Sequence, residues 1–200
     1  MILELPDDKY VKRLKDMWLH WFDLNEAKES LESMDFKNSD VVNRALAQNS
    51  IVLFYKCFGN NEFRDNSLKR DKVLANYPPE AKNVFDYYKD LRNKFIVHDE
   101  SRLAQANASV ILQSNKKHPF IDTFCTVAVA DKYKSAKDRE GLGSFHHLIT
   151  VSMQWVEEQI DKLSDLLKKQ YEEKALSDFQ GLEPLHLRVP TQDEIYKKRY

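Results

Sequence analysis

The chain has 200 residues, of which 42% are hydrophobic and 12% aromatic, and this composition excludes an intrinsically disordered protein. The length fits one domain built around a single core. Because 31 basic residues oppose 32 acidic ones, the formal net charge is -1, which excludes general electrostatic attraction to nucleic acid.

A long first helix is expected from Asp7 or Asp8, either of which can cap it, to about Met34. Its apolar positions recur at steps of four and three, which places them in one stripe along the helix. The stripe, widened by two aromatic residues, consists of Tyr10, Leu14, Met17, Trp21, Leu24 and Leu31, with Trp18 and Phe22. We interpret His20 as a residue at the boundary of the core.

A second helix is predicted from Ser39 or Asp40 to Gly59, with Gly59 in the left-handed conformation that often ends helices. Its residues 51–55 are apolar on every side, so we expect this helix to lie at the centre of the fold.

Residues 59–78 are polar, with a short helix expected over Arg70–Ala75. Pro79 suits the first position of a third long helix, and Glu80 suits its first turn. The apolar face predicted to turn inward comprises Val84, Tyr88, Leu91 and Phe95.

Two short β-branched runs, Ala108–Gln113 and Phe124–Val129, are expected to form a hairpin. Ser144 should cap a final long helix whose seam consists of Ile149, Met153, Val156, Ile160, Leu163 and Leu167. The predicted fold is therefore mainly α: a four-helix bundle over residues 1–174, with a short β-hairpin inserted at about 108–130. Residues 175–200 form a C-terminal extension without periodicity.

The stretch Leu91-Arg92-Asn93-Lys94-Phe95-Ile96-Val97-His98-Asp99 closes the third helix and carries an R-x5-H pattern. Six residues of α-helix rotate by about 240° beyond a full turn, so Arg92 and His98 do not share a face of an ideal helix. They can converge if the helix loosens near His98, or if a second copy of the chain supplies the missing partner.

This motif, with long helices on both sides and Cys57-Phe58-Gly59 closing the second helix, resembles the HEPN family. The likeness is greatest to HEPN domains of bacterial and phage abortive-infection and toxin–antitoxin systems. The resemblance implies a helical bundle that pairs as a homodimer across a two-fold axis and cuts RNA without a metal. It implies RNA as substrate and an antitoxin protein as a further partner.

The residue types suit that chemistry, in which the ribose 2′-hydroxyl attacks the adjacent phosphorus. His98 can transfer a proton near neutral pH, and Arg92 presents a permanent charge with a fork of donors to phosphate. Asn93 can hydrogen-bond the phosphate or hold the imidazole in one tautomer. These three are the candidate catalytic residues, and Lys94, Lys116, Lys117 and His118 are candidate RNA contacts.

Two alternatives remain open. Arginine and histidine at a helix C-terminus often only cap or solvate it. Many HEPN domains are inactive and serve as binding or scaffold modules, so a module that engages a protein partner is the second hypothesis. A purely structural bundle that uses its apolar seams for assembly is the third.

Other patterns point to no further chemistry. His146 and His147 open the last helix, but the chain has no H-E-x-x-H or Cys/His cluster and no phosphate-binding glycine loop, so neither a metal nor another cofactor is expected. Cys57 and Cys125 are interpreted as free buried thiols. The sequence shows neither a signal peptide nor a membrane span, and we expect a cytoplasmic protein.

Overall fold

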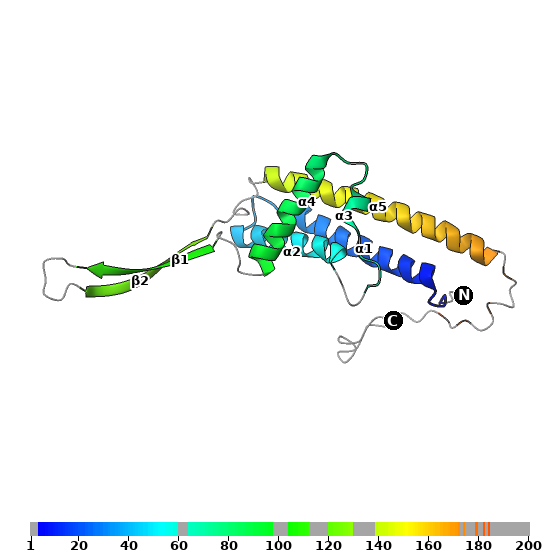
Figure 1. The fold of residues 1–200 in the computed structure, drawn as a ribbon, viewed down its shortest axis with the longest axis horizontal. Helices are drawn as coiled ribbons and strands as arrows, with labels where there is room; N and C mark the ends of the chain where they lie inside the picture. The colour runs from blue at the N-terminus through cyan, green and yellow to red at the C-terminus, as the bar shows by residue number, and fades with distance from the viewer. Residues whose placement is uncertain are drawn as a thin grey trace.

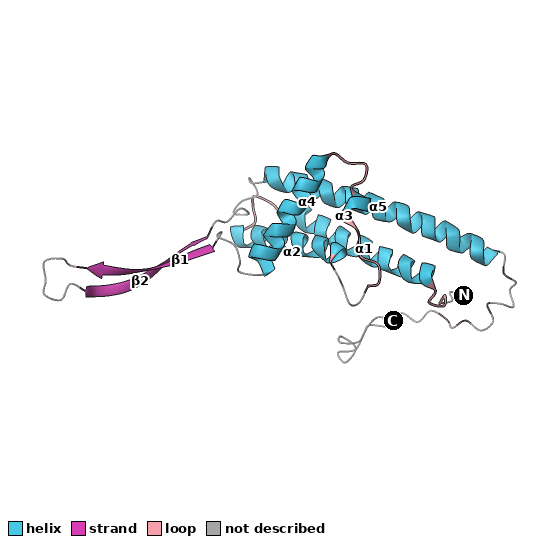
Figure 2. Ribbon diagram, viewed as in Figure 1, coloured by secondary structure: helices cyan, strands magenta, loops and turns pink. Residues whose placement is uncertain are grey.

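A computed structural model describes residues 4–59, 64–97, 104–112, 120–129, 139–172, 174, 179, 182 and 184. This part of the chain is mainly helical, as predicted (Figure 1, Figure 2). The helices are α1 (Lys9–Glu32), α2 (Asp40–Phe58), α3 (Arg70–Val73), α4 (Pro79–Leu91), the π-helix η1 (Arg92–Val97) and α5 (Arg139–Glu172). The predicted C-terminal extension lies almost entirely outside the described residues.

The first two helices begin at the predicted caps. The Asp8 carboxylate accepts hydrogen bonds from the backbone N–H groups of Tyr10 and Val11, each at 2.8 Å, and so satisfies two donors that the first turn leaves open. Ser39 caps α2 in the same way, accepting from Val42 at 3.4 Å.

The prediction for Gly59 is wrong. This glycine follows α2 with φ -79° and ψ 160°, which is extended rather than left-handed backbone. Its N–H still donates to the carbonyl of Tyr55 at 3.0 Å. Because the chain leaves α2 in an extended direction, no left-handed residue is needed at this end.

The helix α1 lies beside both α2 and α5 (Figure 1), and the apolar faces of these three elements form most of the core. The predicted seam of α5 is confirmed, since all six of its residues are buried. On α1 the core positions include Met17, Leu24 and Leu31. The core therefore follows the two longest helices of the described chain.

An aromatic cluster joins α2, α4 and α5. The ring centroids of Phe54 and Phe145 are 5.2 Å apart, and those of Tyr88 and Phe145 are 4.4 Å apart. The Tyr55 hydroxyl donates to the Phe85 carbonyl at 2.5 Å, which ties α2 to α4, and burial raises the pKa of this phenol far above its usual value.

The inward face of α4 differs by one position from the prediction. Phe85, Tyr88 and Leu91 are buried, whereas Val84 is only partly buried. The aromatic cluster accounts for this, because it accommodates the larger ring of Phe85. The side chain of Phe95, also predicted to face inward, lies outside the description.

The last helix begins at Arg139 rather than at Ser144, so that prediction is wrong as well. It runs through Gly141 and Gly143, and no described glycine has a positive φ. Glycine in a helix costs about 1 kcal/mol relative to alanine, a bias that longer-range packing can override.

Two antiparallel strands, β1 (Ala104–Leu112) and β2 (Phe120–Val129), lie between η1 and α5 in the chain. Their register runs from Ala104 opposite Val129 to Leu112 opposite Phe120, with an irregularity between Ile111 and Leu112. Figure 2 shows the pair as a twisted ribbon that extends away from the helices. None of the described helices has the length and hydropathy needed to cross a bilayer.

Candidate functional site

The motif arginine lies where the helix changes type. The α-helix α4 ends at Leu91, and the backbone continues from Arg92 to Val97 as the π-helix η1. A π-helix joins residue i to residue i+5, so it winds more loosely than an α-helix, and such turns occur often at functional sites. The helix therefore winds more loosely from Arg92 onward, and a loosened helix is one of the two ways in which Arg92 and His98 can converge. His98 lies outside the described residues.

Arg92 and Asn93 form a hydrogen-bonded pair. The Arg92 Nη1 donates to Asn93 Oδ1 at 2.8 Å, and both side chains are half-buried. Because a guanidinium has donors only, the amide oxygen of Asn93 must face Arg92. The NH₂ group of Asn93 therefore points away from the guanidinium. Asn93 therefore orients the arginine, and its predicted contact to the phosphate or to His98 stays a prediction.

The guanidinium also has an unused donor. The Nε of Arg92 is buried and has no hydrogen-bond partner within the described part of the chain. A buried donor without a partner costs about 1 to 3 kcal/mol, so it favours any acceptor that reaches it. An anionic oxygen would satisfy it well.

Arg92 and Asn93 line a pocket of about 480 Å³, which we call the motif pocket. Four segments build it: the end of α2, residues 68–71, the second half of α4, and η1. Its aromatic lining comes from Tyr55, Phe58 and Phe85, and the centroids of Phe58 and Phe85 are 4.9 Å apart. The pocket thus combines flat apolar rings with charged side chains.

Carboxylates neutralise only some of the cations that line the motif pocket. Arg70 contacts both oxygens of Asp86, at 2.8 and 2.7 Å, so these two groups largely neutralise each other. The other lining carboxylate, Asp71, lies 3.2 Å from Arg70 and 3.4 Å from Lys82. Lys69, Lys89 and Arg92 form no ion pair with any described residue, which leaves three cations available to an anionic ligand.

Of the four predicted RNA contacts, only Lys94 lies within the described residues. Lys94 is exposed, forms an ion pair with Asp90 at 3.5 Å, and does not line the motif pocket. Lys116, Lys117 and His118 lie outside the described residues. The lining cations Lys69 and Lys89 were not predicted. Lys89 is one helical turn before Arg92, a local signal that the sequence does carry, whereas Lys69 reaches the pocket only through the fold.

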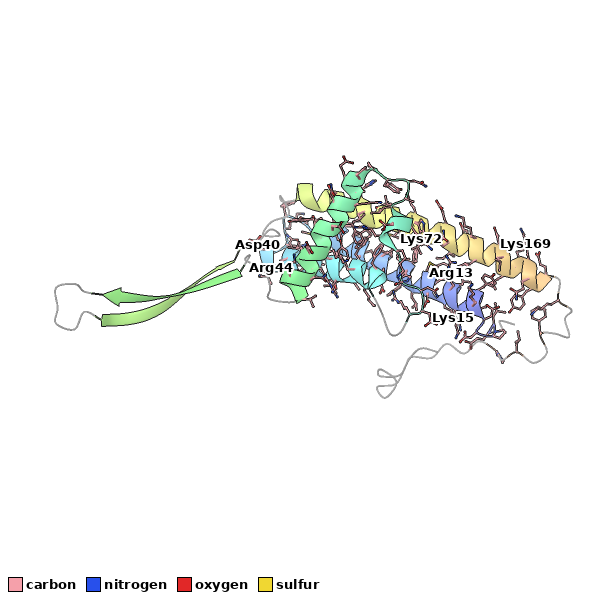
Figure 3. The ribbon with its side chains drawn as sticks, in the orientation of Figure 1. Arg13, Lys15, Asp40, Arg44, Lys72 and Lys169 are labelled. Carbon is pink, nitrogen blue, oxygen red and sulfur yellow. The ribbon has the colours of Figure 1, made fainter. Side chains whose placement is uncertain are left out.

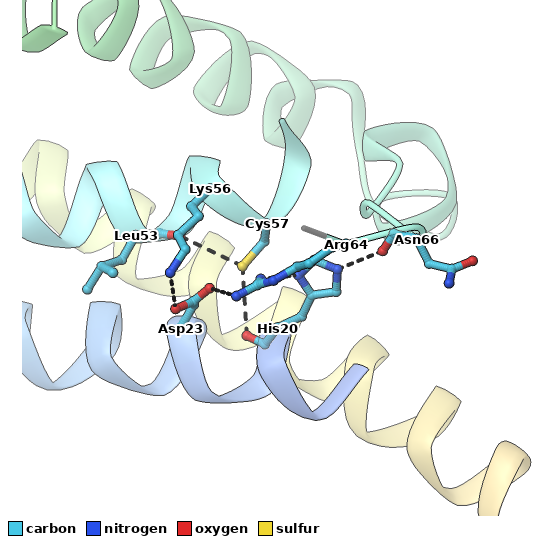
Figure 4. A network of polar contacts seen from close by, with 7 residues as sticks. All are labelled: His20, Asp23, Leu53, Lys56, Cys57, Arg64 and Asn66. Carbon is cyan, nitrogen blue, oxygen red and sulfur yellow. Dashed lines mark hydrogen bonds and ion pairs between the residues drawn. The ribbon is translucent and has the colours of Figure 1, made fainter. Parts of the chain in front are cut away.

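A second polar cluster, which we call the His20 network, lies between α1 and residues 64–66 (Figure 4). His20 has an exposed fraction of 0%, so the boundary position predicted for it is wrong. Its Nδ1 lies 2.9 Å from Arg64 Nη1, and its Nε2 lies 2.7 Å from the Asn66 carbonyl. Since arginine can only donate, His20 Nδ1 accepts the hydrogen bond from Arg64. The ring proton is therefore on Nε2, which donates a hydrogen bond to the Asn66 carbonyl.

Acidic groups complete the His20 network. Asp23, which is 3% exposed, pairs with the buried Arg64 and also with Lys56 at 2.9 Å. The buried Asp16 accepts from the backbone N–H and the side-chain amide of Asn66, at 3.0 and 2.8 Å. Burial lowers the pKa of His20 to about 4, so this histidine is neutral near pH 7.

The His20 network positions the motif pocket rather than forming a reactive centre of its own. It holds Arg64 and Asn66 against α1, and the chain reaches the pocket lining two residues later, at Leu68. Burial raises the pKa of the neighbouring Cys57 thiol to about 12, which makes this cysteine unreactive.

The remaining candidate histidines are separate from both clusters. His146 Nε2 lies 3.0 Å from Glu32 on the surface, and this hydrogen bond lowers the pKa of the Glu32 carboxyl. His147 lies beside the ring of Tyr77, 6.4 Å between centroids. No group of three or more potential metal ligands occurs among the side chains that the structure describes.

Comparisons of the chain with protein-family models, curated proteins and solved structures give no match.

Proposed function

We propose that the chain is a metal-independent endoribonuclease of the HEPN type, built on a four-helix bundle with an inserted β-hairpin. The observation that supports it best is the environment of Arg92. Its guanidinium is oriented by Asn93, keeps an unpaired buried donor, and lines a pocket that also presents Lys69 and Lys89. Cations beside aromatic rings suit the phosphate and base of RNA.

The proposed reaction is an internal transfer. The 2′-oxygen forms a bond to phosphorus as the bond to the 5′-oxygen breaks, which leaves a cyclic phosphate and a free 5′-hydroxyl. One His98 accepts the proton of the 2′-hydroxyl, and the His98 of a second copy protonates the departing 5′-oxygen. Arg92 binds the phosphate oxygens and stabilises the charge that builds up on them. Two-fold pairing of the chain thus completes the site.

This activity fits a protein of host defence or a toxin restrained by an antitoxin protein, because unrestrained RNA cleavage harms the cell that makes it. RNA is the proposed substrate and a homodimer the proposed active form.

The test is RNA cleavage by the purified protein in the presence of a chelator. We expect His98→Ala and Arg92→Ala to lower the rate by about 10² to 10⁴ without unfolding the protein. We expect Arg92→Lys to keep only part of the activity, because lysine lacks the fork of donors. The products should end in cyclic phosphate.

Lys169→Ala is the control, since it removes an exposed cation of α5 that does not line the motif pocket and should leave the rate within about two-fold. Cleavage by a folded His98→Ala protein at the wild-type rate would remove His98 from the mechanism. A wild-type protein that neither binds nor cleaves RNA would contradict the proposed nuclease activity.

The second candidate is a non-catalytic module that binds a protein partner. It is favoured by exposed aromatic residues on α1, where Trp18 and Phe22 are one helical turn apart and 52% and 58% exposed. Exposed aromatic patches often mark protein interfaces. Under this hypothesis the wild-type protein does not cleave RNA, and Trp18→Ser with Phe22→Ser disrupts a complex that Arg92→Ala leaves intact.

A further inference from the structure

A second polar pocket lies on the other side of the segment that borders the motif pocket. Its volume is about 250 Å³, and we call it the Trp155 pocket. Its lining comes from α1, residues 65–69, α3 and α5, and includes Arg13, Asp65, Lys69, Lys72 and Trp155. Leu68 and Lys69 also line the motif pocket, so the two pockets share one wall.

The Trp155 pocket is cationic. Arg13, Lys69 and Lys72 line it against a single carboxylate, that of Asp65. Lys72 is exposed and forms no ion pair with any residue in the described ranges. Arg13 reaches from α1 to α5, where its Nη2 donates to Gln159 Oε1 at 3.4 Å. Figure 3 shows Arg13 on α1, Lys72 on α3 and Lys169 near the far end of α5.

The same pocket contains a large aromatic ring. Trp155 is only partly buried, although Val156 next to it and Met153 are core residues. Gln159, one turn further along α5, is the residue that holds Arg13, so the indole and the guanidinium line the same pocket. A partly exposed indole beside cations is the arrangement on which single-stranded nucleic acid stacks.

The shared wall is itself held in place. The His20 network binds Arg64 and Asn66 to α1, and the Leu68 N–H donates to the Cys57 carbonyl at 2.9 Å. Lys69 extends from this wall and donates to Ser67 Oγ at 3.0 Å. An RNA strand bound in one pocket can therefore cross the shared wall, which carries Lys69, and reach the other pocket.

We infer that the Trp155 pocket binds the nucleotide next to the one held in the motif pocket, as part of a track for single-stranded RNA. Lys72 and Arg13 contact its phosphate, and its base lies on Trp155. This inference rests on the proposed nuclease function, because the motif pocket supplies the reacting phosphate. It assigns RNA contacts to residues 13, 72 and 155 in addition to those expected from the sequence.

The experiment measures binding of two probes to the full chain. One is a 2′-O-methyl RNA hexamer, which lacks the attacking hydroxyl and spans both pockets. The other is a nucleoside 3′-monophosphate, which is long enough for the motif pocket alone. We expect Lys72→Ala to weaken hexamer binding about five-fold and to leave mononucleotide binding unchanged. Lys169→Ala removes an equally exposed lysine and should change neither.

A second measurement reports on stacking. Tryptophan emission of the wild type should fall on addition of the hexamer, and Trp155→Phe should lose that fall while Trp18 and Trp21 remain. Hexamer binding that Arg92→Ala weakens and Lys72→Ala does not would overturn the inference and leave the nuclease proposal standing. A hexamer that does not bind the wild type at all would overturn both.

Discussion

At the scale of single residues, two arginines of the described chain have unsatisfied Nε groups, in opposite settings. Arg64 and Arg92 each have a buried Nε that finds no partner in the described part of the chain. Arg64 is 5% exposed and neutralised by Asp23, so its remaining donor is enclosed by protein. Arg92 borders a pocket and has no carboxylate partner among the described residues, so its donor can be satisfied by a ligand. Burial alone does not distinguish the two roles; the neighbouring charge does.

His20 predicts a stability loss in mild acid. Burial lowers its folded-state pKa to about 4, whereas the unfolded chain should titrate near the reference value of about 6.5. Above that value the imidazole is neutral in both states. As the pH falls below it, only the unfolded chain takes up the proton, so the free energy of unfolding should fall by about 3 kcal/mol between pH 6.5 and pH 4.

Urea unfolding at a series of pH values checks this, with His20→Gln as the test variant. Glutamine has an amide that can donate to Asn66 and an oxygen that can accept from Arg64, but it does not titrate. We expect it to flatten the acid-side fall, and His147→Gln, at an exposed histidine, to keep it. Equal slopes for His20→Gln and wild type would mean that other groups cause the acid sensitivity.

At the scale of elements, the buried ion pair of Asp23 and Arg64 holds the segment after α2. We expect it to contribute more to the free energy of unfolding than an exposed ion pair does. Asp23 and Arg64 are both nearly inaccessible, so Arg64→Ala leaves a buried carboxylate with only Lys56 and should cost about 3 to 5 kcal/mol. The double variant with Asp23→Ala should lose much less than the sum of the single losses.

The matched control is the pair Arg70 and Asp86, whose side chains are 34% and 53% exposed. Its coupling energy, from the same double-mutant cycle in urea, should stay below about 1 kcal/mol. Similar coupling energies for the two pairs would show that the His20 network does not hold the segment.

The π-helix η1 gives a second prediction for an element. A π-turn behaves as one extra residue within a helix, so deletion of the exposed Lys94 should restore ordinary helical hydrogen bonds with little change in stability. The residues that follow, including His98, would then change their direction relative to Arg92. Thermal unfolding should shift by only a few degrees, while RNA cleavage falls by about 10² or more. Lys94→Ala removes the same side chain, a candidate RNA contact, but keeps the chain length, so it should lose far less activity than the deletion. An active deletion variant would show that the π-turn has no role in the site.

These elements also show what the sequence could reveal. Asp8, Ser39 and Pro79 act locally, through their own hydrogen bonds or fixed φ, and the starts of α1, α2 and α4 were predicted from them. The end of α2 at Gly59 was predicted too, but the extended conformation of Gly59 and the start of α5 at Arg139 were not, because the direction of the chain at these points depends on distant packing. The position of Arg92 at a helix end was predicted, but its pocket unites segments up to 38 residues apart, from Tyr55 to Asn93. His20 was misplaced for the same reason, since its partner Arg64 is 44 residues away.

At the scale of the whole molecule, a net charge of -1 means that RNA binding must come from a few local cations. The motif pocket offers Lys69, Lys89 and Arg92, and the Trp155 pocket adds Arg13 and Lys72. A hexamer that uses about three phosphate contacts should lose affinity with salt at a logarithmic slope of about -2, because single strands release about 0.7 counterions per neutralised phosphate.

Titrations of the non-cleavable hexamer between about 50 and 200 mM salt measure that slope. Lys89→Ala removes one lining cation of the motif pocket and should reduce the slope by about 0.7, whereas Lys169→Ala should leave it unchanged. A slope near zero would mean that phosphates are not bound by these side chains. A slope several units steeper would require a broad basic surface, and the even balance of 31 basic and 32 acidic residues argues against one. The slope therefore tests whether a nearly neutral chain gathers enough charge in two adjoining pockets to hold an RNA strand.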